Sequence, residues 1–170
     1  VSRYFGHYVG QLYKIAGQLP PAGDQDAVRA QFEAVVRQAL EREWFGVLCN
    51  SLSACAFTFV LFSEGGEGRA LDGSDLLVRL LACYGLETRR EELEWFAESF
   101  WSQSVGDKLE RGWLPPSAVD YPDRVFEILS LSLGRSVPEL RSLMDQLLGE
   151  WKRQAAEVLY RHGQPVPGDW

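Results

Sequence analysis

The fold class is indicated most clearly by residues 24–40, which read DQDAVRAQFEAVVRQAL. Apolar residues recur in this stretch at intervals of three and four positions, with charged residues between them: Val28, Phe32, Val35, Val36 and Leu40. Such spacing is typical of an α-helix that buries one face. Alternation with a period of two, the mark of a half-buried strand, is scarce in the rest of the chain. The sequence therefore predicts an all-α fold, a single-domain helical bundle with orthogonal packing.

Upstream and downstream of this stretch, one further helix and one long apolar segment are expected. The first helix covers residues 4–16 and ends before the Pro-Pro pair at 20–21. The helix at 24–40 leads directly into an apolar stretch at 44–62, which Asn50 and three hydroxyl residues interrupt. We interpret that stretch as a buried core segment rather than a membrane span. A short strand is allowed only near residues 57–60.

The second half of the chain carries helix-capping signals. A short helix is expected to start at Asp72 or Ser74 and to end before Gly85. The capping-box spacing of Thr88 and Glu91 predicts the start of a further helix. This helix is apolar nearly all round its first turns, so we expect it to lie deep between its neighbours.

Two more helices are predicted before an extended tail. Pro122 suits the first position of one helix, because its fixed φ angle fits a helix and its missing N–H needs no partner there. Ser136 and Glu139 repeat the capping-box spacing at the start of the last helix, which is expected to run to about Arg161. Gly163 and two prolines then predict the tail.

Length, charge and cysteine content limit the class of protein. The chain has 170 residues, 46% of them apolar, which is enough for one substantial core, so one domain over residues 1–170 is predicted. The formal net charge is −7 and the Lys and Arg residues are dispersed, which argues against a nucleic-acid partner. Three cysteines without a disulfide-like spacing favour a reducing cytoplasm.

The residues that could carry chemistry also have simpler structural interpretations. Cys49 and Cys55 do not have a zinc-ligand spacing, so all three cysteines are first interpreted as small core hydrophobes. The acidic residues at 91, 92 and 94 could form an acid/base pair, but a solvated helix start that stabilises the helix dipole is the better interpretation. The six tryptophans are expected to be core and interface anchors.

One stretch resembles a known family of enzymes. Residues 43–57 read EWFGVLCNSLSACAF, which is similar to the pterin- and cluster-binding stretch of the aldehyde ferredoxin oxidoreductase family. Further strings follow in the family's order: Gly85-Leu86-Glu87-Thr88, Glu91-Glu92-Leu93, Leu114-Pro115, residues 143–148 and Gly163-Gln164-Pro165. Upstream, residues 2–7 resemble the family's Arg-Gly-x-x-His segment. The resemblance covers nearly the whole chain and corresponds to the helical C-terminal domain of a family member.

The resemblance implies a set of site residues. Cys55 matches the thiolate that gives a [4Fe–4S] cluster its fourth ligand, and Ala54 and Ala56 match the backbone beside the metal-bound pterin. Asn50 stands where the family has an Asp that hydrogen-bonds the pterin, and His7 matches a histidine beside the tungsten, with a catalytic role. If the resemblance holds, we expect His7, Asn50 and Cys55 to converge on one side of the domain.

The resemblance also implies cofactors and partners. In the complete enzyme a tungsten- or molybdenum-pterin would oxidise an aldehyde to its acid, and electrons would leave through the [4Fe–4S] cluster to ferredoxin. The chain lacks the CxxCxxxC string that supplies the other three cluster ligands, so N-terminal domains or a partner subunit are expected to carry them. The chain would then be a C-terminal domain, a fragment or a small subunit. The alternative is a non-catalytic helical interaction module derived from the same fold.

Overall fold

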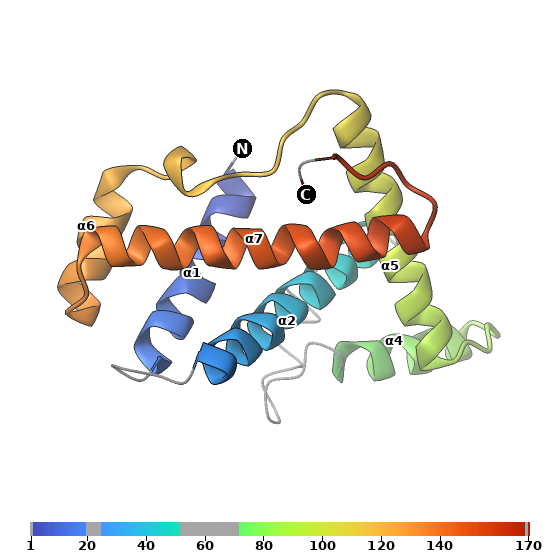
Figure 1. Cartoon of the computed structure of the whole chain (residues 1–170). Coiled ribbons are helices and arrows are strands. Elements are labelled where there is room, and N and C mark those ends of the chain that lie inside the picture. The colour runs from blue at the N-terminus through green and yellow to red at the C-terminus, as the bar shows by residue number, and fades with distance from the viewer. Residues whose placement is uncertain (1, 20–24, 52–71, 169) are drawn as a thin grey trace. The chain divides into compact units, whose positions relative to one another are not determined.

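The computed structural model describes residues 2–19, 25–51, 72–168 and 170, shown in colour in Figure 1. The helices in these ranges are α1 (Ser2–Gln18), α2 (Gln25–Ser51), α4 (Asp72–Cys83), α5 (Arg90–Glu110), α6 (Asp123–Leu133) and α7 (Val137–Arg161), with a 3-10 turn at Ala118–Asp120. No strand occurs in the described ranges. The predicted all-α class is confirmed, whereas the strand allowed near residues 57–60 lies outside the described residues.

Most helix ends fall where the sequence predicts them. α4 ends before Gly85, whose φ of 78° is the left-handed conformation that glycine adopts most easily. At the start of α7 the Ser136 Oγ accepts a hydrogen bond from the Glu139 N–H at 3.4 Å, and α7 ends at Arg161 as predicted. Pro122 precedes the first helical residue of α6 instead of occupying that position, so this prediction is wrong by one residue.

The predicted capping box of α5 is also wrong by one residue. The Glu92 carboxylate accepts a hydrogen bond from the Arg89 N–H at 3.0 Å and pairs with the Arg89 guanidinium at 2.8 Å. These hydrogen bonds lower the pKa of Glu92. Thr88 and Glu91 offer no such charged pair, so the helix begins one residue later than their spacing predicts.

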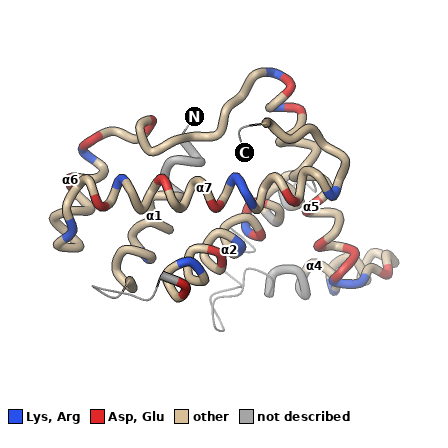
Figure 2. The backbone as a smooth tube through the Cα atoms, viewed as in Figure 1, with Lys and Arg blue, Asp and Glu red and all other residues tan. Residues whose placement is uncertain are grey.

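Charged residues of both signs are distributed along the helices. Figure 2 shows Lys and Arg mixed with Asp and Glu along α2 and α7. None of the described helices combines the length and the apolar character needed to cross a bilayer.

The chain divides into two compact units, and the first comprises Val1–Ala39, Leu114–Ala156 and Asp169–Trp170. In this unit α1 packs against α6. The core is formed by almost completely buried side chains: Leu12, Ile15, Phe32, Val36, Phe126, Leu140, Met144, Leu147 and Trp151. In α1, α2 and α7 these positions repeat at helical spacing, which is why a sequence with this pattern folds as helices.

An arginine stabilises the end of α1 within the first unit. Arg135 donates hydrogen bonds from Nε to the Ala16 carbonyl at 2.8 Å and from Nη2 to the Leu19 carbonyl at 3.0 Å. Carbonyl groups at a helix C-terminus lack partners within the helix and carry partial negative charge, so a guanidinium is a favourable partner. This contact joins segments that are more than a hundred residues apart in the sequence.

The second unit comprises Leu40–Trp113 and Glu157–Gly168. In this unit α4 packs against α5. Its core cluster consists of four buried side chains: Leu48, Leu77, Leu93 and Ala97. Three partly buried side chains pack against this cluster: Trp44, Val78 and Leu81. The expectation of one domain over residues 1–170 stays a prediction.

The first turns of α5 are only partly buried, contrary to expectation. Its buried residues recur every four positions from Leu93 to Val105 and form one stripe. Trp101 lies in this stripe, and its Nε1 donates a hydrogen bond to Glu43 Oε2 at 3.1 Å. Three aromatic side chains fall on other faces of the helix and are exposed: Trp95, Phe96 and Phe100. Apolar content predicted a deep helix, but a helix buries only the face that meets a neighbour.

Candidate functional site

The residues that the family resemblance implicates are only partly described. Ala54, Cys55 and Ala56 lie outside the described residues, so their cluster and pterin contacts stay predictions. Asn50 is exposed in the last turn of α2. His7 belongs to α1 by its backbone, and its side chain lies outside what the structure describes. Their convergence on one site stays a prediction as well.

The remaining cysteines give one correction. Cys83, the last residue of α4, is a free and exposed thiol, so its interpretation as a core hydrophobe is wrong. The helix buries Leu77 and packs Val78 and Leu81 against the core, and Cys83 lies outside that face. The side chain of Cys49 lies outside the described residues.

The ligand set of this chain does not fit a complete metal cluster. Among the described residues no group of three or more His, Cys, Asp or Glu side chains is placed to hold a metal ion. A [4Fe–4S] cluster takes four thiolate ligands, and the sequence has three cysteines. A cluster bound at Cys55 would therefore need ligands from another domain or subunit.

The second unit contains a cavity with a volume of about 270 Å³. Residues of α2 and α5 and one residue of the last turn of α7 line it: Glu41, Trp44, Leu48, Glu91, Leu93, Glu94, Trp95, Ala97, Glu98 and Arg161. The α5 residues at 91, 94, 95 and 98 are spaced three and four apart, which places them on one face of the helix. We refer to this feature as the acidic–aromatic cavity.

Part of the cavity wall is fixed by ion pairs. Glu98 Oε1 lies 2.6 Å from Arg161 Nη1 and 3.0 Å from His162 Nε2. The side chains of Glu98 and His162 are only 13% and 8% exposed. Glu94 pairs with Arg90 at 2.9 Å. The Trp95 ring centroid lies 5.8 Å from that of His162, so the indole adjoins the imidazole that contacts Glu98.

The lining of the cavity has an excess of negative charge. Four carboxylates and one guanidinium line it, which gives a formal charge of −3. Arg90, paired with Glu94, reduces this to −2. The buried Nε1 of Trp44 has no hydrogen-bond partner among the described residues. The arrangement thus offers hydrogen-bond acceptors, aromatic surface and one unused donor.

Sequence reasoning missed this cavity. It treated the acids at 91, 92 and 94 as a solvated helix start, which holds for the exposed Glu91. The tryptophans are expected to be core and interface anchors, and Trp101 and Trp151 are indeed core residues, whereas Trp95 is 56% exposed and is not. The helical spacing of Glu91, Glu94, Trp95 and Glu98 was the available signal.

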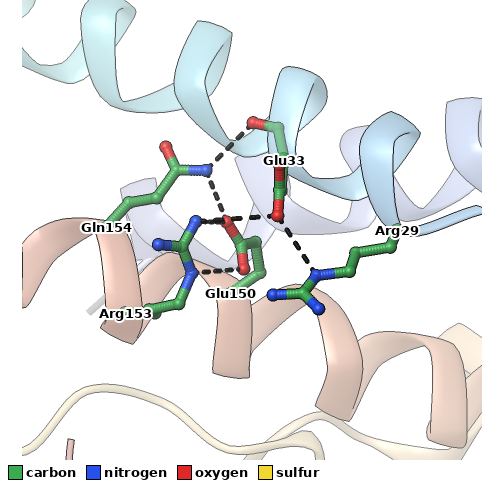
Figure 3. A network of polar contacts seen from close by, with 5 residues as sticks. All are labelled: Arg29, Glu33, Glu150, Arg153 and Gln154. Atoms are coloured by element: carbon green, nitrogen blue, oxygen red, sulfur yellow. Dashed lines mark hydrogen bonds and ion pairs between the residues drawn. The ribbon is translucent and has the colours of Figure 1, made fainter. Parts of the chain in front are cut away.

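A second cluster of polar side chains lies in the first unit, and its members form hydrogen bonds and ion pairs with one another (Figure 3). The buried Gln154 donates from Nε2 to the Glu33 carbonyl at 3.0 Å and to Glu150 Oε1 at 2.6 Å. Glu150 also pairs with Arg153 at 2.6 Å, and Glu33 pairs with Arg29 at 3.2 Å. Burial alone would raise the pKa of Glu150, but the hydrogen bonds from Arg153 and Gln154 and the nearby guanidinium charges lower it. This cluster is a structural connection between α2 and α7.

Comparison of the chain with models of known protein families, with curated proteins and with solved structures found no match.

Proposed function

We propose that this chain is the helical part of a larger tungsten- or molybdenum-pterin aldehyde oxidoreductase, which oxidises an aldehyde to its acid and passes electrons to ferredoxin. The observation that carries the proposal is the order of family-like strings along the chain, from residues 2–7 through 43–57 to Gly163-Gln164-Pro165. An all-helical chain is also what the family's C-terminal domain requires. The proposal assigns the chain no activity when it is alone.

The chain's own residues would have supporting roles in such an assembly. Cys55 would supply one thiolate, and the remaining cluster ligands would come from a further domain or a partner subunit. Asn50, with the backbone at Ala54 and Ala56, would hydrogen-bond the pterin. His7 would hold or move a proton beside the metal.

The test is metal analysis of the assembled protein. The chain is co-expressed with the products of its neighbouring genes, and iron and acid-labile sulfide are measured in the purified complex. We expect about four iron atoms per complex for the unaltered chain, as one [4Fe–4S] cluster requires. Cys55→Ser is expected to lose most of this iron, because a cluster that lacks one thiolate is labile.

Cys83→Ser is the matched control, because it removes an exposed thiol from α4. It is expected to retain the full iron content. Absence of iron from the complex, or equal iron in both variants, would refute the assignment of Cys55 as a ligand.

A second candidate function is a non-catalytic helical interaction module of the same origin. The exposed aromatic side chains of α5 favour it: Trp95, Phe96 and Phe100. Large exposed aromatic groups are enriched where proteins bind one another. A complex of the unaltered chain that contains no iron, and that forms equally well with Cys55→Ser, would support this candidate over the oxidoreductase.

A further inference from the structure

The acidic–aromatic cavity has a lining that restricts the chemistry of any ligand. Its apolar wall consists of aliphatic side chains and two indoles: Leu48, Leu93, Ala97, Trp44 and Trp95. Its volume of about 270 Å³ is just below the range of ~300–1,000 Å³ that is typical of small-molecule sites. A ligand that fits is therefore small and has an apolar portion.

The charge of the lining determines the sign of the ligand. Four glutamates and one arginine line the wall, where Arg161 pairs with Glu98 and the neighbouring Arg90 pairs with Glu94. A carboxylate or phosphate placed there would be repelled, whereas a cation would be attracted. The side chains of Glu91 and Glu94 lie on the same face of α5 as Trp95, so carboxylate and indole are available to one ligand.

A hydrated metal ion fits this cavity less well than an organic cation. Ca²⁺ takes six to eight oxygen ligands, and among the described residues no group of three or more potential ligand side chains is placed to hold a metal ion. Indole rings attract ammonium groups through their π electrons, and the alkyl portion of an amine can replace water against the leucines.

We propose that the acidic–aromatic cavity binds a small protonated organic amine, with its apolar portion against Trp44 and Trp95 and its ammonium group toward the glutamates. The proposal does not rest on the oxidoreductase function, because it uses Glu91, Glu94 and Trp95 in place of Asn50 and Cys55. The ion pair of Glu98 with Arg161 limits the negative charge that the ligand meets.

The test uses three probes of nearly equal shape and different charge. The full chain is titrated with 2-phenylethylammonium, 2-phenylethanol and phenylacetate, and binding is followed by calorimetry and by tryptophan fluorescence. We expect the ammonium probe to bind about tenfold more tightly than the neutral alcohol, and phenylacetate to bind weakest. Equal binding of the ammonium and carboxylate probes, or no binding of the ammonium probe, would overturn the proposal.

Two charge variants are expected to change the affinity in opposite directions. Glu91→Gln removes one wall carboxylate and should raise the Kd of the ammonium probe about threefold. Arg161→Gln removes the cation that pairs with Glu98 and should lower that Kd by a similar factor. Misfolding cannot produce a gain in affinity, so the Arg161 variant separates binding from stability.

Glu127→Gln is the matched control, because it removes an exposed carboxylate from α6 in the first unit. It is expected to leave the Kd unchanged. If Glu127→Gln weakens binding as much as Glu91→Gln, the attraction comes from the overall charge of the protein and the cavity assignment is wrong.

Discussion

The two compact units use their charged residues differently. In the first unit Glu33 and Glu150 are paired with Arg29 and Arg153, and the buried amide of Gln154 connects them. In the second unit the carboxylates that line the cavity outnumber the guanidinium groups beside them. Polar groups that are satisfied within the protein contribute to its stability. The proposed role of the excess carboxylates beside the aromatic surface in the second unit is ligand recognition instead, and substitutions can test the two roles separately.

The largest expected effect is on the core of the first unit. Trp151 is 2% exposed, and its ring makes an edge contact with the ring of Tyr8 and a tilted contact with that of Trp170, at centroid distances of 6.2 and 5.5 Å. Trp151→Ala should lower the free energy of unfolding by about 3–5 kcal/mol, because it removes buried apolar surface and leaves a cavity. Urea denaturation followed by circular dichroism measures this. A loss below about 1 kcal/mol would show that Trp151 is not a core residue.

A smaller effect is expected for the polar connection between α2 and α7 in the first unit. Gln154 is 7% exposed and makes two hydrogen bonds, so Gln154→Ala should lower the free energy of unfolding by about 1–2 kcal/mol. Gln146→Ala is the control, because Gln146 is exposed on the same helix. Its expected effect is within about 0.5 kcal/mol. Equal losses in the two urea titrations would mean that the network adds nothing beyond helix propensity.

The pH dependence of stability offers a third and smaller test of the same network. The pKa of Glu150 is lower in the folded protein than in the unfolded chain. The carboxyl group therefore binds a proton more readily in the unfolded chain as the pH falls. The stability that Glu150 contributes is present above its unfolded pKa and is lost as the pH falls through the lower folded value. Glu150→Gln should therefore show a shallower loss of urea midpoint between about pH 5 and pH 3 than the unaltered chain. Parallel pH profiles of the two proteins would contradict this role.

The helices could be predicted from the sequence because their signals are local. The spacing of Val28, Phe32 and Val36, the glycine after α4 and the Ser136 cap each act within a few residues. The start of α5 was missed because the Arg89–Glu92 ion pair, which propensities do not include, stabilises a different capping residue.

The cavity and the polar network could not be predicted, because both depend on which helices meet. The sequence shows that Glu91, Glu94 and Glu98 share a face of α5, but not that Trp44 of α2 lines the same cavity. It likewise gives no sign that Gln154 meets the carbonyl of Glu33, 121 residues away. Such contacts are set by tertiary packing, which the residue pattern of a single sequence does not describe.

The smallest expected effect concerns the tryptophan at the cavity. Trp95 is 56% exposed and contacts the rings of Phe96 and His162 at centroid distances of 5.4 and 5.8 Å. Trp95→Ala should lower the free energy of unfolding by less than about 1 kcal/mol, because most of this indole already meets water. The same variant should weaken binding of 2-phenylethylammonium about twofold to fivefold, since a cation–π contact is lost. A stability loss near that of Trp151→Ala, with the Kd unchanged, would mean that Trp95 is a core residue and that both units use their tryptophans alike.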